Sequence, residues 1–393
     1  MAKWIDRFLD IFSKGMPISP IPGGIYQYQS PPDVDKPFRL HLRLEPDGRG
    51  LLMINAHTTL HLNQTASEFA YYFIQGYGED KAVSEITRRY NIKAEAAKLD
   101  YLDLNEKIQV LIQTPDLDPV TYLDIDRRDP YSSDISAPYR LDCALTYRVN
   151  EPDFAHSAPL DRVRRELLTE EWKTILSKSW AAGIPHIVFT GGEPTLRPDL
   201  PELVAHCESL GQVTGLLTDG FRLSDHDYLH ALLNSGLDHV MILLDPREDQ
   251  SWEAVTDVLI EDIFVTIHLT ISSVDTSLPF SAIDRLEKMG VKNLSLTAEN
   301  PGISSTLSEC TNYAIFKGFS LVSDIPVPYS AFNQFNLESD EIDRSEGAGN
   351  VWLYIEPDGD VLPGQGMKMV LGNLLTDDWL SIWAKHIPQP IHK

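Results

Sequence analysis

Cysteine is scarce in this chain of 393 residues, which has only Cys143, Cys207 and Cys310. Three thiols far apart in sequence cannot form a disulfide framework, and none belongs to a CxxC pair. Because disulfide scaffolds belong to oxidising compartments, we expect a protein of the reducing cytoplasm.

Positive charge is also in short supply. The chain has 33 Lys and Arg against 58 Asp and Glu, which gives a formal net charge of -25. This excess of acids repels nucleic-acid phosphates and anionic lipid, so we expect no nucleic-acid partner. No apolar run approaches the ~20 residues of a bilayer span, and the N-terminus does not read as a signal peptide.

The chain is nevertheless long enough for several domains, since a single core rarely grows beyond ~250 to 300 residues. Residues 1–37 are predicted to hold an amphipathic helix, with apolar residues at helical spacing from Trp4 to Phe12, followed by an extended connector rich in Pro and Gly. Residues 116–135 are polar and contain several turn-forming residues, and we interpret them as a second linker.

Residues 38–115, between these linkers, predict a small α+β domain. Alternating apolar residues surround the turn at 46–48 and predict an antiparallel ribbon. Three helical segments follow, and the first carries a capping-box pattern at Thr65 and Glu68.

Strands and helices alternate over residues 136–305, which predicts an α/β fold with a parallel sheet, open or curled toward a barrel. The predicted strands are 139–147, 186–190, 213–219, 239–245, 263–271 and 293–299, and the predicted helices are 159–183, 200–211, 225–236 and 281–290. Ligands of such sheets bind at the carboxyl ends of the strands.

The string TGGEP comes directly after the predicted strand HIVFT. Two glycines allow the main chain to approach a ligand, Glu193 offers a carboxylate, and Pro194 ends the strand. This string resembles the second motif of the radical SAM superfamily, which makes radicals from S-adenosylmethionine (SAM). In that family the loop holds the methionine amino group of SAM.

Two later strand ends also resemble this family: LLTDG is similar to its third-strand TNG, with Asp219 in place of Asn, and LLDP at 243–246 is similar to its fourth-strand SLD. The resemblance implies a partial (βα) TIM-like barrel and a residual SAM pocket. The residues implied in that pocket are Thr190, Gly191, Gly192, Glu193, Pro194 and Asp219.

The family also carries a [4Fe-4S] cluster on a CxxxCxxC motif after the first strand. Here the matching string is LTYRVNEPDFAHS, so the cluster positions hold Val149, Asp153 and His156. The cluster requires soft thiolates, and valine has no donor atom. Asp153 and His156 could bind another metal, but two hard donors and a valine make a poor site. We therefore expect neither cluster nor metal here.

The C-terminal residues 306–393 include VWLYIEPDGDVLPGQG and GNLLTDDWLSIW. The Pro-Asp-Gly string at 357–359 predicts a hairpin turn between two strands. They resemble the end of a SPASM or twitch domain, as in peptide-maturation enzymes similar to the PQQ-biosynthesis E protein. The family's cysteine position holds Gly364, so the resemblance implies a remnant without its auxiliary cluster.

The ribbon-and-helices segment, with LHLNQTA and EITRRYNI, resembles the PQQ-biosynthesis D protein, the peptide-recognition domain of ribosomal-peptide maturation. In that family a leader peptide adds to the domain as an extra strand. The alternative is a generic winged helix that reads DNA, against which the acidic charge argues.

The leading hypothesis is a catalytically silent, radical-SAM-like protein that binds a precursor peptide and presents it to an active partner enzyme. One alternative is an active radical SAM enzyme whose cluster ligands are Cys143, Cys207 and Cys310, gathered by folding. The other is a protein that binds SAM weakly without iron, through Glu193 and Asp219.

Overall fold

The computed structural model describes residues 19–31, 34, 36–55, 58–114, 135–150, 157–323, 325–334 and 347–386. The chain divides into two compact units, Met1–Ser136 and Ala137–Lys393. The amphipathic helix predicted near the N-terminus, and all but the last residue of the predicted linker 116–135, lie outside the described residues.

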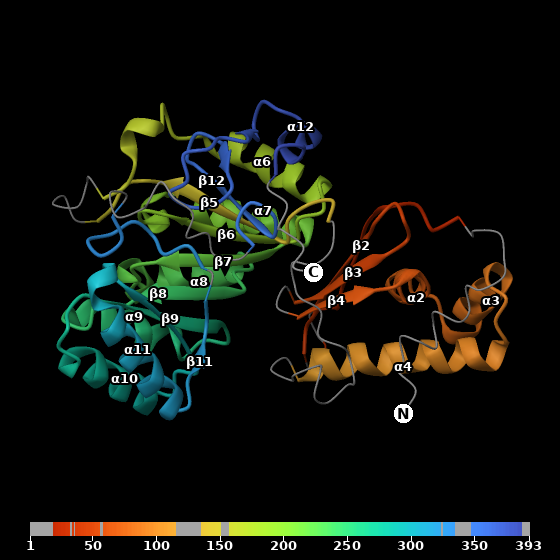
Figure 1. Ribbon diagram of the computed structural model, residues 1–393, viewed down its shortest axis with the longest axis horizontal. Helices are drawn as coiled ribbons and strands as arrows, with labels where there is room; N and C mark the ends of the chain where they lie inside the picture. The colour runs from red at the N-terminus through yellow and green to blue at the C-terminus, as the bar shows by residue number, and fades with distance from the viewer. Residues whose placement is uncertain are drawn as a thin grey trace. The chain divides into compact units, whose positions relative to one another are not determined.

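The first unit is an antiparallel sheet with three helices (Figure 1). Its strands β1 Gly24–Gln29, β2 Arg39–Leu44, β3 Gly50–Ile54 and β4 Thr58–Leu62 are hydrogen-bonded in the order β1-β2-β3-β4. Its helices are α2 Gln64–Ile74, α3 Glu79–Arg89 and α4 Ala94–Gln113. The predicted ribbon and three helices are confirmed, and the turn at 46–48 joins β2 to β3 with Gly48 at a φ of 86°.

Strand β1 corrects the prediction of an extended connector over residues 15–37. It pairs with β2 along its whole length, from Gly24 opposite Leu44 to Gln29 opposite Arg39. Aromatic packing holds it in place: the Tyr26 ring meets Tyr71 edge-on with centroids 4.7 Å apart. The Pro and Gly residues on either side of this strand concealed it in the sequence.

The predicted capping box at Thr65 and Glu68 is wrong. Helix α2 is capped by Asn63, whose side-chain oxygen accepts a hydrogen bond of 2.9 Å from the Ala66 N–H. Glu68 is 1% exposed, and its side chain interacts with other residues inside the unit instead of capping the helix. It forms an ion pair of 2.8 Å with Arg89 and accepts a hydrogen bond of 2.7 Å from the Tyr90 hydroxyl.

The second unit contains a ten-stranded sheet in the order β11-β10-β9-β8-β7-β6-β5-β12-β13-β14. Strands β5 to β11 run parallel, which confirms the predicted partial barrel. These strands are β5 Arg140–Thr146, β6 His186–Gly191, β7 Val213–Thr218, β8 His239–Leu243, β9 Phe264–Ile271, β10 Asn293–Ala298 and β11 Ser320–Leu321.

The connecting helices are α6 Thr169–Ala181, α7 Leu200–Leu210, α8 His226–Asn234, α9 Asp249–Val258, α10 Ser277–Met289 and α11 Ser304–Phe316. Several differ from prediction. The helix predicted at 159–183 begins only at Thr169, after the 3₁₀ turn Leu160–Arg162, and the helix predicted at 281–290 begins at Ser277. Helices α9 and α11 were not predicted. The Leu168 N–H donates a hydrogen bond of 2.8 Å to the Glu171 carboxylate, which fixes the true start of α6.

The C-terminal residues extend the same sheet. Strand β12 Trp352–Ile355 pairs in parallel with β5, and β13 Asp360–Leu362 and β14 Gly372–Asn373 continue antiparallel before helix α12 Trp379–Trp383. The predicted turn at 357–359 is confirmed, with Gly359 at a φ of 92°.

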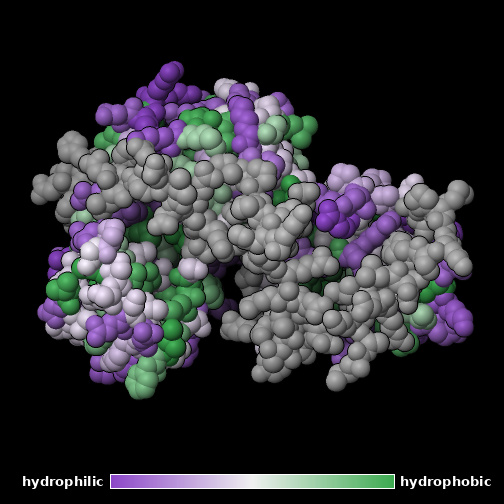
Figure 2. Space-filling model, in the orientation of Figure 1, coloured by the Kyte–Doolittle hydropathy of each residue, from purple (hydrophilic) through white to green (hydrophobic). Residues whose placement is uncertain are grey.

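The opposite edge of the sheet has hydrophobic side chains on its surface. Figure 2 shows such residues on the face where β11 and the end of α11 lie, and Ile315, Phe316 and Leu321 are all exposed there.

None of the described helices is long and apolar enough to cross a membrane.

Candidate functional site

The TGGEP loop begins at the carboxyl end of β6 and is bound to the end of β5. The Gly192 N–H donates to the Thr146 carbonyl (2.9 Å), and the Glu193 N–H donates to the Arg148 carbonyl (2.7 Å). A Cβ at Gly191 would lie 2.1 Å from the Thr146 oxygen, and one at Gly192 would lie 2.3 Å from the Arg148 oxygen. The glycines are therefore required for close approach to β5.

Glu193 is 2% exposed, and its carboxylate is held by groups of the protein itself. Its Oε1 accepts hydrogen bonds of 2.8 Å from the Thr195 N–H and the Thr218 hydroxyl, and its Oε2 accepts one of 2.8 Å from the Asp219 N–H. Burial, and then the charge of Asp219, raise the pKa of Glu193 to about 8. A carboxyl pKa raised this far indicates that nearby positive charge does not stabilise the ionised form.

Asp219 directly follows strand β7 and lies beside Glu193. Its Oδ2 accepts a hydrogen bond of 2.6 Å from the Asn150 side-chain amide, and its Oδ1 accepts one of 3.0 Å from the Phe221 N–H. Burial raises the pKa of Asp219 as well. The Asn150 bond ties the loop after β5 to the end of β7, so the predicted residues Glu193 and Asp219 do come together at one edge of the sheet.

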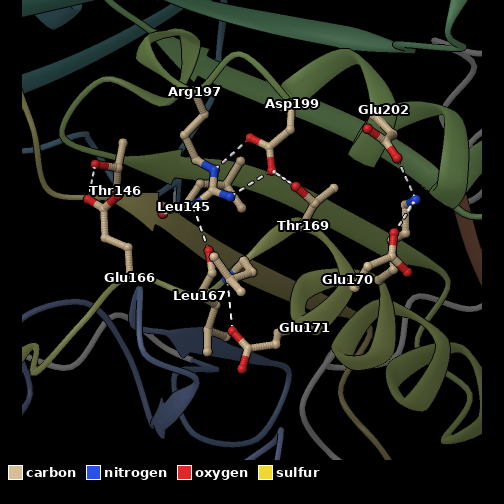
Figure 3. A network of polar contacts seen from close by, with 12 residues as sticks. Leu145, Thr146, Glu166, Leu167, Thr169, Glu170, Glu171, Arg197, Asp199 and Glu202 are labelled. Atoms are coloured by element: carbon tan, nitrogen blue, oxygen red, sulfur yellow. Dashed lines mark hydrogen bonds and ion pairs between the residues drawn. The ribbon is translucent and has the colours of Figure 1, made fainter.

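A buried arginine that sequence reasoning missed supports this loop (Figure 3). Arg197 is 6% exposed and forms a fork on Asp199 with hydrogen bonds of 2.9 and 2.7 Å. It also donates to the carbonyls of Leu145 (3.3 Å) and Leu167 (2.9 Å). Although burial alone would raise the pKa of Asp199, hydrogen bonds from Arg197 and Thr169 hold it below its usual value.

These loops surround a cavity of about 390 Å³ at the carboxyl ends of the strands. Residues 328–332 form one wall, and the Tyr329 N–H donates to the Gly191 carbonyl (2.8 Å). The polar and charged residues in its lining are Asn150, Glu193, Asp219, Asp245, Arg247, Glu248, Ser251, His268, Thr270 and Ser330. Both the volume and the combination of apolar walls with polar groups suit a small ligand.

The remaining predicted positions do not all belong to this cavity. Gly192 and Val149 line it, whereas Thr190, Gly191 and Pro194 are buried outside its lining. Asp153 and His156 lie outside the described residues.

Gly364 follows β13, where an added Cβ would meet Ala348 at 3.4 Å and the Met367 sulfur at 3.6 Å. It is therefore surrounded by protein atoms and is not part of the cavity lining.

The alternative in which three cysteines converge is wrong. Cys143 lies in β5 and Cys207 in α7, whereas Cys310 of α11 packs with Ile271 and Ile303 in a separate cluster. All three are buried, and burial raises the pKa of each thiol. Among the described residues, only Glu356, Asp358 and Asp360 bring three ligand groups together, and none is a thiol. The residues that surround the cavity do not fit a [4Fe-4S] cluster.

The fold and the loop together define an α/β protein with a radical SAM partial barrel. Residues 150–249 match the Radical SAM superfamily. Over 123 residues the chain is 37% identical to the PqqA peptide cyclase of Streptomyces rochei, covering 31% of this chain and 34% of that protein. Over 249 residues it is 27% identical to the PqqA peptide cyclase of Bradyrhizobium diazoefficiens, covering 56% of this chain and 64% of that protein.

Solved structures extend the likeness of fold over most of the chain. SuiB of Streptococcus suis bound to the precursor peptide SuiA has a TM-score of 0.58 at 17% identity, covering 87% of this chain and 86% of SuiB. SuiB bound to S-adenosylmethionine has a TM-score of 0.55, also at 17% identity, covering 88% of this chain and 86% of SuiB. These structures show a shared fold, and the match to the Radical SAM superfamily is confined to residues 150–249.

Proposed function

We propose that this chain is a cluster-free, radical-SAM-like protein that binds a precursor peptide and serves as a recognition partner of an active radical SAM enzyme in ribosomal-peptide maturation. The observation that carries the proposal is the contrast between an intact TGGEP loop and the residues Val149, Asp153 and His156 at the cluster positions. Val149 lines the cavity with a side chain that has no donor atom. Without iron, reductive cleavage of SAM has no mechanism.

The proposal assigns separate roles to the parts of the chain. Residues 38–115 form the peptide-recognition domain, joined to the strand β1 that precedes them, and residues 136–305 form the barrel. Residues 306–393 are a SPASM-like remnant, and residues 1–37 and 116–135 are the N-terminal segment and the linker. The proposed setting is the cytoplasm, where ribosomal precursor peptides are made.

The register of the first unit shows which backbone groups are available to a peptide. The Asn55 N–H donates to the Arg39 carbonyl (3.0 Å). The backbone N–H and C=O groups of successive residues point alternately to the two neighbouring strands. Those of the odd-numbered residues in β3 therefore bond to β2, and those of the even-numbered residues bond to β4. Met53 lies opposite Thr59, but its backbone groups point to β2. The N–H and C=O of Thr59 therefore point away from β3, toward the open edge of β4.

The open edge of β4 fits a peptide better than the open edge of β1. Strand β4 carries the buried Leu60 and Leu62 next to its edge, whereas the exposed side chains of β1 are Gln27 and Gln29. Backbone bonds at an edge give affinity, and apolar pockets beside it give selectivity.

A pair of proline substitutions tests peptide addition at β4. In the full chain, Thr59→Pro removes a backbone N–H that points outward from β4. Gln27→Pro removes the equivalent outward N–H from β1. The hydrogen bond from the Ser30 N–H to the Phe38 carbonyl shows that even-numbered residues of β1 bond to β2, so the N–H of Gln27 points outward. We expect labelled precursor peptides encoded beside this gene to bind the native chain and Gln27→Pro equally, with at least about tenfold weaker binding to Thr59→Pro. Loss in both variants, or no binding by the native chain, would contradict this.

Reconstitution tests the absence of a cluster. After anaerobic incubation with iron and sulfide, we expect the native chain to retain no cluster absorption. The triple variant Val149→Cys, Asp153→Cys and His156→Cys should take up about one cluster per chain, because thiolates are what the site lacks. Cluster uptake by the native chain at that level would refute the proposal.

A second candidate function is binding of SAM without iron, favoured by the cavity beside Glu193 and Asp219. If loss of chelation by iron costs on the order of 4 kcal/mol, affinity falls about a thousandfold. Calorimetry with SAM measures this directly, and tight binding would favour a SAM sensor over a peptide scaffold.

A further inference from the structure

We infer that the outer surface of the barrel has a site for a divalent transition-metal ion such as zinc, between helices α8 and α9. Its ligands are two histidines of α8 and two carboxylates from the end of α9 and the turn after it: His226, His230, Asp257 and Glu261. The inference goes beyond peptide recognition and is independent of the proposed function, because it uses no residue of the cavity lining or of the first unit.

The first reason is the spacing of the two histidines. His226 and His230 are four residues apart in α8, so their side chains project from the same face of the helix, with Cβ atoms ~5–6 Å apart. Two histidines at this spacing are a pair with which a helix binds zinc. Their side chains are 65% and 54% exposed, so both rings can turn toward a common ion without displacing packed atoms.

The second reason is the distance from each histidine to a facing carboxylate. The His226 Nε2 lies 4.0 Å from the Asp257 Oδ1, and the His230 Nε2 lies 3.7 Å from the Glu261 Oε1. These distances are too long for a direct hydrogen bond. Zinc bonds of ~2.0–2.2 Å place two ligand atoms of a tetrahedral site ~3.3–3.5 Å apart. The four ligand atoms form two separate pairs in this structure, and rotation of the exposed rings brings both pairs around one ion.

The third reason is that the two carboxylates are not engaged elsewhere. Within the part of the chain that the structure describes, the carboxylates of Asp257 and Glu261 accept no hydrogen bond and form no ion pair except with these histidines. Asp249 and Glu253 precede them at the same four-residue interval. This line of negative charge along α9 attracts a cation.

The ligand set selects the class of metal. Imidazoles suit zinc, copper and nickel, whereas calcium and magnesium prefer oxygen ligands alone. Four protein ligands leave no open position, so the site is structural and not catalytic. Phe221, just before α8, and Ser251 of α9 both line the cavity. An ion that joins α8 to the end of α9 therefore braces one wall of the cavity from outside.

Calorimetry with zinc chloride tests the inference on the untagged full chain, after removal of metals by a chelator and with excess magnesium and calcium present. The added cations compete for the oxygen-only cluster at 356–360. We expect the native chain to bind one more zinc ion than the double variant His226→Gln, His230→Gln. Equal zinc stoichiometry and affinity in the two proteins would overturn the inference.

A variant that moves one imidazole separates the effect of spacing from that of histidine content. His230→Ala combined with Ala231→His exchanges two exposed positions of α8 and turns the ring by ~100° around the helix. We expect this swapped variant to lose the same zinc ion, and native affinity in it would contradict the geometry. Asp257→Asn and Glu261→Gln should each weaken zinc binding about tenfold or more, because each removes an anionic ligand. Unchanged affinity in both would also contradict it.

The thermal midpoint of the native chain gives a readout that does not depend on the folding of any variant. Zinc that binds the folded second unit should raise this midpoint by mass action, and it should leave the midpoint of the swapped variant unchanged. No rise in the native chain at a saturating zinc concentration would overturn the inference. The peptide-binding and reconstitution experiments would be unaffected by that failure.

Discussion

Buried carboxylates show how single residues in this protein take roles that their sequence positions do not reveal. Glu68 occupies the last position of a capping-box pattern, yet its side chain interacts with Arg89 and Tyr90 in the interior of the first unit. Glu193 occupies a ligand-binding motif, yet three protein donors surround it. In both cases packing decides what the charged group does.

Glu68→Ala should lower the free energy of unfolding by about 3 kcal/mol, because it removes the buried carboxylate to which Arg89 and the Tyr90 hydroxyl donate. The matched control is Glu85→Ala, which removes an exposed pair with Arg88 and should change the free energy by less than about 0.5 kcal/mol. Urea unfolding followed by circular dichroism measures both. Equal effects would show that the buried network does not stabilise the unit.

Stability should fall as the pH rises from about 4.5 to about 8, because the folded state keeps a proton on Glu193 that the unfolded chain has released. The raised pKa of Asp219 acts in the same direction. The slope from one such group reaches about 1.4 kcal/mol per pH unit. Glu193→Gln should flatten the dependence of the unfolding free energy over this range, and an unchanged slope would assign it to other groups.

At the scale of elements, the site depends on bonds between segments that are distant in sequence. The end of β5 is bound to the TGGEP loop by backbone hydrogen bonds, and Arg197 connects β5, the residues before α6 and the start of α7 (Figure 3). The bond from Asn150 to Asp219 adds a tie to β7. These ties hold the described residues that directly follow β5, up to Asn150, against the ends of β6 and β7.

Arg197→Lys should destabilise the second unit by about 2 to 4 kcal/mol, because lysine cannot reproduce the fork on Asp199 and the two carbonyl bonds together. Arg165→Lys changes an exposed arginine that pairs with Glu171 and should cost less than about 0.5 kcal/mol. Thermal or urea unfolding of the two variants gives the comparison. A small effect at Arg197 would mean that water or neighbouring groups replace its bonds.

At the scale of the whole molecule, charge restricts the partners. A formal net charge of -25 opposes association with polyanions, although the first unit has the order of elements of a winged helix. The same charge favours basic partners over acidic ones.

Duplex DNA should not bind this chain, because counterion release requires surplus Lys and Arg. We expect fluorescence anisotropy with labelled duplex to show no binding tighter than about 10⁻⁴ M at low salt. A salt-dependent affinity near 10⁻⁶ M would instead favour the DNA-reading interpretation of the first unit.

The sequence by itself determined the parallel sheet, most of its strands, the two hairpin turns and the absence of thiols at the cluster positions, because these depend on local periodicity, turn residues and identity at a motif. Only the tertiary structure decided that β1 belongs to a sheet, that Asn63 caps α2, that the glycines of TGGEP face β5, and that Arg197 supports the loop. Those outcomes depend on contacts between residues far apart in the chain, and a local pattern carries no information about which distant groups will meet.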